Sequence, residues 1–346
     1  MTPSPSRARI RGRPPATRAG LLPTKRKPTV QRLTYDDIKR ASGRVAGHVR
    51  PVALAPADPG EPGGLPCETW FALEHIQHTG SFKARGAHNF LAAHREEGAL
   101  PDAGVTIASG GNAGLACAWA ARRLGVPATV FLPETAPAVK VSKLRGYGAD
   151  VRLTGTEYAE ALAACQAFAA STGALSSHAY DHPLIAAGAG TLLDEILQRL
   201  PGLDTVVVAV GGGGLFAGVA TAARHHGVRV VAVEPENCRA LDAALAAGSP
   251  VDVAVDSVAA DSLGARRVSR TALEAAQHGD VHTVLVPDDA IVEARQSLWD
   301  DRRLAVEHAA GTAWAALTCG AYLPGRGERI AVVLCGANTD PSDLVR

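Results

Sequence analysis

Residues 206–220 read VVVAVGGGGLFAGVA, which is an apolar run, four consecutive glycines and then an apolar helical pattern. The apolar run predicts a buried strand, and the residues after the glycines predict a helix. Glycines at such a junction let backbone amides crowd around an anion, and the positive end of the helix dipole adds to the attraction. The segment therefore predicts an α/β unit that carries a phosphate-binding loop.

This glycine run differs from two common nucleotide-binding loops. No Gly-Lys-Ser or Gly-Lys-Thr follows it, which excludes a Walker A loop. Four consecutive glycines also depart from the G-x-G-x-x-G pattern, although Glu234, about 20 residues further on, keeps a dinucleotide-binding unit open. A tight turn without a ligand is the simplest alternative at this point.

Short apolar strands alternate with helical patterns along most of the chain. We expect strands at 69–74, 105–108, 128–132, 150–153, 205–210, 228–234 and 330–336, and helices at 113–124, 137–146, 156–171 and 215–226. Continuous apolar strands separated by helices are typical of parallel sheets that helices cover on both faces. Two such runs predict an α/β protein of two domains, each with a twisted parallel sheet flanked by helices.

Composition and charge set further bounds. The 346 residues include 35 basic and 34 acidic side chains, and 47% of the residues are hydrophobic, as in a globular protein. No apolar run approaches the roughly 20 residues that cross a bilayer, so we expect no membrane association. Six cysteines include no Cys-x-x-Cys pair, which predicts reduced thiols in a cytoplasmic protein and no zinc site.

The near-neutral total charge hides a basic segment at the start of the chain. Residues 1–30 hold eight basic side chains and no acidic one, which leaves a net charge of −7 on residues 31–346. Prolines interrupt these charges and like charges repel, so we predict a disordered basic tail over residues 1–32. A nucleic-acid-binding arm and an organelle transit segment are the alternatives to a passive extension. We expect no nucleic-acid partner, because all the chemical motifs lie in the acidic remainder.

Lys83 lies in the segment HTGSFKARGAHNF, residues 78–90, after the strand expected at 69–74. A lysine in a turn between Gly and Ser residues at a strand end can present its amine to a cleft. If the amine is desolvated there, its pKa falls and it becomes a Schiff-base nucleophile. An ordinary surface lysine is the alternative.

Two further segments combine a strand end with polar or reactive groups. In ASGGNAGLA, residues 108–116, an amide-rich helix start suits a carboxylate or a phosphate, and Asn112 offers both a donor and an acceptor. A plain connecting turn is the alternative. In VVLCGAN, residues 332–338, Cys335 ends a buried strand, where a core thiol is the ordinary interpretation.

The four motifs resemble, in the same order along the chain, those of the fold-type II pyridoxal-phosphate enzymes. This is the tryptophan-synthase-β-like family that includes serine and threonine dehydratases. The resemblance runs from about Thr34 to Asp340. It implies that Lys83 carries pyridoxal 5'-phosphate as a Schiff base and acts as the catalytic base. It implies cofactor contacts from Phe82, Lys83, Asn112, Gly211, Gly212, Gly213, Gly214, Leu215 and Cys335. It implies that the substrate carboxylate is bound by Ser109, Gly110, Gly111 and Asn112.

Several positions refine what the resemblance implies. A neutral Cys335 thiol facing the pyridine nitrogen cannot keep that nitrogen protonated, which favours β-elimination over transamination and indicates the serine dehydratase branch. Gly110 stands where serine racemases carry an acid serine, so racemisation is not expected. The family's Glu-Pro pair reads Glu307-His308 here, and we expect this change only to adjust packing. Ala240 replaces the acidic residue of magnesium-binding relatives, so we expect no metal, although a monovalent cation near Glu234 stays open.

The resemblance therefore implies an ammonia-lyase that converts L-serine or L-threonine to a 2-oxo acid and ammonia by β-elimination. The alternatives are a dehydratase of another 3-hydroxy amino acid, a β-replacement synthase of cysteine synthase type, and a pyridoxal-phosphate protein without catalysis. An NAD-dependent dehydrogenase remains if the resemblance is accidental. The family also implies a homodimer, with the cofactor in the cleft between a large domain, 33–85 and 191–346, and a small domain, 86–190.

Overall fold

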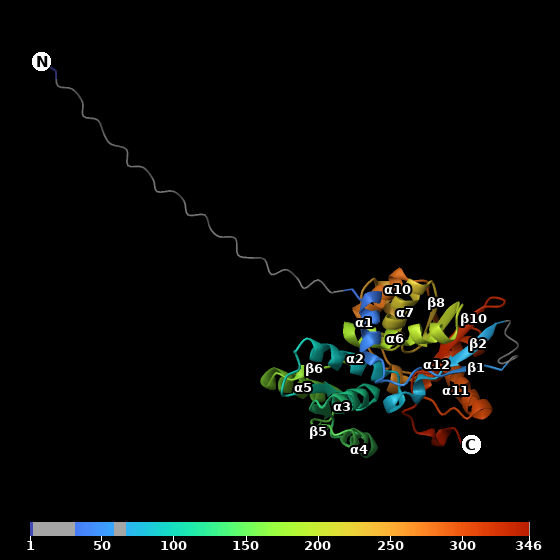
Figure 1. Ribbon diagram of the computed structural model, residues 1–346, viewed down its shortest axis with the longest axis horizontal. Helices are drawn as coiled ribbons and strands as arrows, with labels where there is room; N and C mark the ends of the chain where they lie inside the picture. Colours follow the sequence, from blue (N-terminus) through green and yellow to red (C-terminus); the bar gives the residue numbers. More distant parts are fainter. Residues whose placement is uncertain (3–31, 59–66, 346) are drawn as a thin grey trace. The chain divides into compact units, whose positions relative to one another are not determined.

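The computed structural model describes residues 1–2, 32–58 and 67–345. The basic tail predicted over residues 1–32 lies almost entirely outside these described residues. The described residues from Arg32 onward group into one compact unit, whose elements are labelled in Figure 1. No helix among the described residues is long and apolar enough to span a membrane.

The larger sheet within the described residues has six strands. In spatial order these are β1 (Leu54–Pro56), β2 (Glu68–Ala72), β10 (Arg329–Val333), β7 (Thr205–Ala209), β8 (Arg229–Pro235) and β9 (Val281–Val286). All neighbours are parallel except β1, which pairs with β2 in the antiparallel sense. The central strands β7 and β10 are buried along nearly their whole length, as expected for strands covered on both faces.

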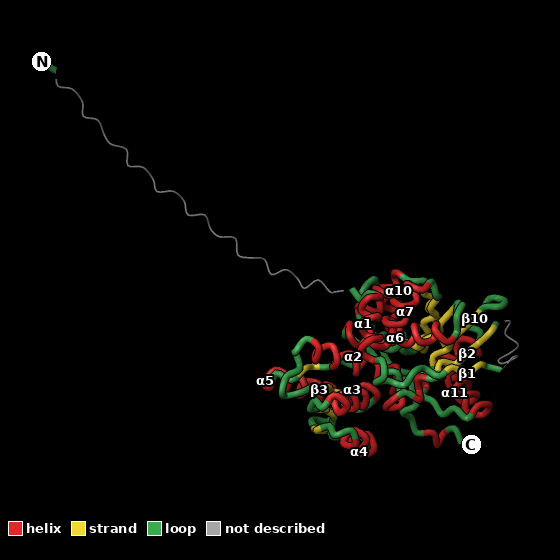
Figure 2. Tube along the Cα trace, viewed as in Figure 1, coloured by secondary structure: helices red, strands yellow, loops and turns green. Residues whose placement is uncertain are grey.

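The smaller sheet has four parallel strands. They are β5 (Asp150–Leu153), β4 (Ala128–Leu132), β3 (Val105–Ala108) and β6 (Leu175–Ser176), in that spatial order. In Figure 2 the yellow strand β3 lies with α3 and α5, away from the group formed by β1, β2 and β10. The larger sheet lies in one hydrophobic core, and the smaller sheet has a second core together with a small third cluster of Ala108, Phe131, Ala161 and Cys165.

Helices cover both sheets. They are α1 (Tyr35–Val45), α2 (Lys83–Glu96), α3 (Asn112–Leu124), α4 (Ala138–Gly146), α5 (Tyr158–Thr172), α6 (Pro183–Arg199), α7 (Gly214–His226), α8 (Ala240–Ala247), α9 (Ala260–Leu263), α10 (Arg270–His278), α11 (Asp288–Arg302) and α12 (His308–Thr318). Two 3₁₀ turns, η1 (Glu74–Ile76) and η2 (His78–Gly80), lead from β2 to α2, and a third, η3 (Pro341–Asp343), lies near the end of the chain.

The predicted α/β fold with helix-flanked parallel sheets is confirmed. Strands β3, β4 and β5 have the predicted bounds, and α3 ends before Gly125, whose φ of 64° suits a residue without a side chain. The sequence analysis missed β1, β6 and β9, which are short or lie at a sheet edge. The division into a large and a small domain stays a prediction.

Candidate active site

One cavity of about 550 Å³ contains every residue that the sequence analysis assigned to the cofactor or the substrate. The loops after β3, β7 and β10 contribute to its wall, because the carboxyl ends of parallel strands lie at one edge of a sheet. Two helices, α3 and α7, begin at this cavity, and the positive ends of their dipoles favour negative charge there.

Lys83 reaches this cavity from the first turn of α2 and not from a turn directly after a strand, as the sequence suggested. Its Nζ donates a hydrogen bond to the backbone oxygen of Ala179 at 3.1 Å and lies 5.0 Å from the centroid of the Phe82 ring. Burial lowers the pKa of Lys83, and the nearby Cys335 and Glu307 only partly oppose this effect. The amine is therefore more readily deprotonated than that of a surface lysine, as a nucleophile requires.

Backbone pairing brings Lys83 and Cys335 together. The Phe82 amide donates to the Cys335 oxygen at 3.0 Å, and the Ala337 amide donates to the Gly80 oxygen at 2.9 Å. Burial raises the pKa of Cys335 to about 12, so its thiol is neutral at physiological pH. The resemblance implied a neutral Cys335 facing the pyridine nitrogen of the cofactor, which stays a prediction; the structure brings Cys335 and Lys83 to the same cavity.

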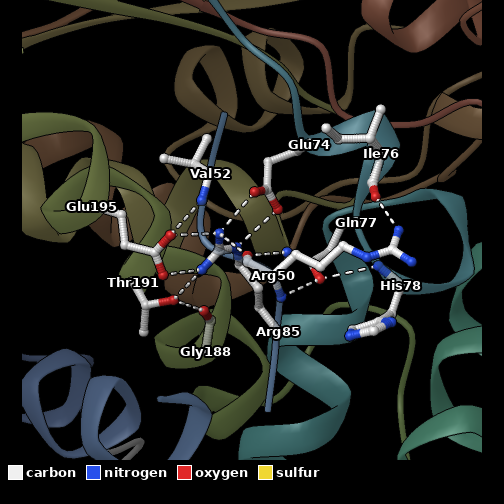
Figure 3. Close-up of polar contacts among 10 residues, drawn as sticks. All are labelled: Arg50, Val52, Glu74, Ile76, Gln77, His78, Arg85, Gly188, Thr191 and Glu195. Atoms are coloured by element: carbon white, nitrogen blue, oxygen red, sulfur yellow. Dashed lines mark hydrogen bonds and ion pairs between the residues drawn. The ribbon is translucent and has the colours of Figure 1, made fainter. Parts of the chain in front are cut away.

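A buried ion network holds the start of α2 in place, as Figure 3 shows. The Arg85 guanidinium donates to both carboxylate oxygens of Glu74 at 2.8 and 2.7 Å and to those of Glu195 at 2.6 and 2.9 Å. Thr191 and the Arg50 backbone oxygen accept its remaining hydrogen bonds. Arg85 is fully buried, so this network ties η1, α2 and α6 together two residues from Lys83. The sequence analysis assigned no role to Arg85, which it included only in the segment around Lys83.

The tetraglycine loop has no room for side chains. Gly213 has a φ of 88°, and a Cβ placed on it would lie 2.4 Å from the Cβ of Ala272. A Cβ on Gly212 would lie 2.4 Å from ring atoms of Tyr180. Glycine is required at both positions, and the loop presents backbone amides to the cavity at the start of α7.

Asn112 is held by two residues that the sequence analysis did not assign to the site. Its Nδ2 donates to both Glu307 carboxylate oxygens, at 2.8 and 3.0 Å, and its Oδ1 accepts from Asn338 Nδ2 at 2.6 Å. The backbone amide of Asn338 also donates a hydrogen bond to the Glu307 carboxylate, at 2.8 Å. Burial raises the pKa of Glu307, although these hydrogen bonds and the charge of Lys83 oppose the rise. The Glu-Pro resemblance was the one sequence signal for Glu307, and it gave no role.

Replacing Glu307 with leucine is expected to lower the free energy of unfolding by about 1–3 kcal/mol, because the half-buried Asn112 and Asn338 lose the acceptor of their hydrogen bonds. Urea unfolding followed by circular dichroism measures this difference. Glu307→Gln is the matched control, since its amide oxygen can still accept one of these hydrogen bonds. Equal stability of Glu307→Leu and the wild type would contradict a structural role for the carboxylate.

The sequence analysis left open whether a monovalent cation binds near Glu234. In the structure the Glu234 carboxylate forms hydrogen bonds with the backbone. Its carboxylate accepts hydrogen bonds from the amides of Leu241 and Asp242, at 2.7 and 2.9 Å, and so caps the first turn of α8. Burial raises its pKa to about 7. Among the described residues, no three His, Cys, Asp or Glu side chains cluster in a way that could hold a metal ion. The cation near Glu234 stays a prediction.

Known proteins resemble the chain in sequence and in structure. A family model described as "Pyridoxal-phosphate dependent enzyme" matches residues 45–336. Human "Serine dehydratase-like" is 38% identical, over 80% of this chain and 86% of its own length. An "L-threonine ammonia-lyase" of Geobacter sulfurreducens is 37% identical, over 89% of this chain and 76% of its own. The structure of maize serine racemase superposes with a TM-score of 0.84 at 27% identity, covering 91% of this chain and 96% of that one.

Proposed function

The chain belongs to the family of pyridoxal-phosphate-dependent enzymes, and on this premise we propose that it is an ammonia-lyase that converts L-serine or L-threonine to a 2-oxo acid and ammonia. The observation that carries the proposal is the presence of Lys83, with its lowered pKa, in one cavity with the tetraglycine loop and a neutral Cys335. Relatives described as a serine dehydratase-like protein and an L-threonine ammonia-lyase support the reaction type.

Pyridoxal 5'-phosphate is the cofactor of this family, and the cavity fits it. The side-chain-free loop of Gly211 to Gly214 at the start of α7 suits the phosphate, and Lys83 suits the covalent attachment. Phe82, Asn112, Leu215 and Cys335 complete the set of cofactor contacts that we propose. When bound, the cofactor withdraws electrons from the substrate Cα, and the protein supplies orientation and electrostatics.

The residues of the chain then have separable roles. With cofactor and substrate in place, the Lys83 amine would accept the proton from the substrate Cα as a general base. The amide-rich loop from Ser109 to Asn112 at the start of α3 holds the substrate carboxylate. Cys335 stays a neutral thiol, which leaves the cofactor a moderate electron acceptor and favours loss of a group from Cβ.

Elimination is favoured over racemisation by the wall next to Gly110. A Cβ on Gly110 would lie 2.9 Å from Cδ2 of Leu132, so an apolar side chain borders the position where racemases carry a serine. Leu132 has no proton to donate. We therefore propose that the structural likeness to a serine racemase reflects the shared fold and cofactor.

We also propose that the protein is a cytoplasmic homodimer with its cofactor between a small domain, 86–190, and a large domain, 33–85 and 191–346. All six cysteines are free thiols, which suits a reducing compartment. The separation of the two largest hydrophobic cores supports the division into domains. Sedimentation of the purified protein measures its oligomeric state.

Gly213→Ala is expected to weaken cofactor binding about tenfold or more, because a positive φ and the contact with Ala272 force the phosphate-binding loop to move. Titration of the apoprotein with pyridoxal phosphate, followed by absorbance, measures the dissociation constant. Gly227→Ala is the matched control, since Gly227 ends the same helix with a φ of 72° and open space around it. Equal loss of affinity in both variants would contradict the assigned site.

A substrate panel tests the proposed reaction. The purified holoenzyme is expected to release 2-oxo acid and ammonia in equal amounts from L-serine or L-threonine, and no D-serine. Formation of cysteine from an activated serine and sulfide, without 2-oxo acid from any hydroxy amino acid, would instead identify a β-replacement synthase. Bound cofactor without any turnover would identify a binding protein.

A further inference from the structure

The segment between β6 and α6, residues 177–182, forms a part of the cavity wall that the cofactor and carboxylate assignments leave unexplained. Two of its residues, Ala179 and Tyr180, line the cavity. The backbone oxygen of Ala179 accepts the hydrogen bond from Lys83 Nζ, at 3.1 Å. The fold of this short segment therefore determines where the acceptor of the reactive lysine lies.

The imidazole of His178 holds this segment in a turn. Its Nδ1 accepts hydrogen bonds from two backbone amides, those of Tyr180 at 3.2 Å and Asp181 at 2.9 Å. An imidazole nitrogen that accepts a hydrogen bond carries no proton, so the ring is neutral and its proton is on Nε2. Asn and Asp side chains form turns of the same kind, in which a side-chain oxygen accepts from the backbone two residues further on. Ala179 lies inside this turn, and the turn fixes the direction of its oxygen.

Tyr180 anchors the same turn on its other side. Its ring packs edge-on against the ring of His178, with the centroids 4.8 Å apart, and its hydroxyl donates to the Arg267 backbone oxygen at 3.2 Å. A Cβ on Gly212 would lie 2.4 Å from atoms of the same tyrosine ring. The turn therefore borders the tetraglycine loop as well as the lysine.

The Ala179 oxygen is important because the charge of Lys83 changes during the proposed reaction. A lysine that accepts a proton as a general base becomes an ammonium group, and a hydrogen bond from that group to an acceptor favours the charged form. Burial opposes the charge, because it lowers the pKa of Lys83. Among the described residues, the Ala179 oxygen accepts the one hydrogen bond that the amine donates. An acceptor that is already in place needs no reorganisation when the proton is transferred.

We propose that His178 is a positioning residue, which acts through the Ala179 oxygen to keep Lys83 in the geometry and the charge state that proton transfer requires. This inference rests on the proposed ammonia-lyase function and adds a residue to it. Protonation of His178 would occupy the Nδ1 lone pair and release both backbone amides. The turn would then loosen, and the amine would lose its fixed acceptor.

The groups around His178 determine the pH at which this release occurs. More than a third of His178 is exposed, so the ring can take up a proton in the folded protein. Burial of the rest of the ring lowers the pKa of His178, Asp181 raises it, and the charge of Lys83 lowers it. Burial raises the pKa of Tyr180 and lowers that of His182 to about 4, so both stay neutral. The turn is therefore expected to open below pH 6.5, the ordinary pKa of histidine.

Two substitutions at His178 separate its role as an acceptor from its titration. His178→Ala removes the acceptor and is expected to lower kcat and kcat/KM about tenfold near neutral pH, with KM little changed, because the base is misplaced. His178→Asn keeps an acceptor for the same amides and has no group that titrates, so its activity is expected to stay within about threefold of the wild type. The ratio of its kcat/KM to that of the wild type is expected to rise below pH 6.5.

Attachment of the cofactor gives a measurement that needs no turnover. Pyridoxal phosphate reacts with the neutral Lys83 amine, so the pH dependence of its rate of attachment to the apoprotein, followed by visible absorbance, reports the pKa of Lys83. His178→Ala is expected to shift this profile to lower pH by about half a unit or more, and His178→Asn is expected to leave it in place. A turn with a merely structural role would lower the stability of His178→Ala and leave the profile unchanged, and that result would overturn the proposal.

His182→Ala is the matched control. The Nδ1 of His182 accepts a hydrogen bond from the Leu184 amide at 3.1 Å and caps the start of α6, but His182 does not line the cavity. We expect its attachment profile to match that of the wild type. An equal shift in His182→Ala and His178→Ala, or a His178→Asn variant that behaves like His178→Ala, would contradict the proposal. Absence of 2-oxo acid from L-serine and L-threonine would instead remove the proposed function, and the attachment profile would then decide the role of His178 on its own. Thermal unfolding establishes that each variant is folded.

Discussion

Lys83→Ala is expected to lower the release of 2-oxo acid from L-serine or L-threonine by about 10⁴-fold, because the variant loses both the nucleophile and the general base. No other amine in the described part of the cavity can replace it, since Lys140 on α4 is paired with Asp261. The variant is expected to keep some affinity for the cofactor, because the tetraglycine loop and α7 are unchanged.

The measurement is single-turnover and steady-state release of 2-oxo acid, together with the visible absorbance of the purified protein. Lys143→Ala is the matched control, since Lys143 is an exposed lysine on α4 that does not line the active-site cavity. Retention of more than about a tenth of the wild-type rate in Lys83→Ala would contradict the role of Lys83, since the loss of a general base alone costs 10²-fold or more.

Arg85→Leu is expected to lower the free energy of unfolding by about 3–5 kcal/mol, the largest loss that we predict for any single substitution in this chain. Glu74 is fully buried and Glu195 is largely buried, and both lose their common partner. Unpaired carboxylates inside a protein are costly because they are removed from water without compensation. The same loss would loosen the start of α2 and hence the position of Lys83.

Chemical unfolding of the holoenzyme measures the loss of stability. Two further variants provide the control and a test of its cause. Arg239→Leu removes an exposed arginine whose ion pair with Asp242 has a separation of 3.7 Å, and we expect a change of less than about 1 kcal/mol. Arg85→Leu combined with Glu74→Leu is expected to recover part of the stability, because one buried charge is removed. An Arg85→Leu protein as stable as the Arg239→Leu control would contradict the account of the network.

The elements that the sequence predicted well are those determined by local pattern. Continuous apolar runs between helical segments are legible as buried strands. Glycines mark the end of α3 at Gly125, with a φ of 64°, and the start of α7 at Gly213, with a φ of 88°. Strand β9 was missed because five of its six residues are partly or fully exposed at the sheet edge, so its apolar run is confined to the last three residues, Val284, Leu285 and Val286.

The side-chain networks were not predictable because their members are far apart in sequence. Arg85 and Glu195 are separated by 110 residues, and Asn112 and Glu307 by 195. The local sequence around each of these residues does not distinguish it from an ordinary polar residue, because its partner becomes a neighbour only in the folded chain.

The central claim, that Lys83 carries the cofactor in this cavity, is tested most directly by chemical fixation. Borohydride reduction of the holoenzyme makes the bond between the cofactor and its lysine permanent, and mass spectrometry of the digested protein then identifies the modified residue. We predict one phosphopyridoxyl group per chain, on Lys83. Modification of Lys140, Lys143 or another lysine in place of Lys83, or no modification of a cofactor-loaded protein, would contradict the account.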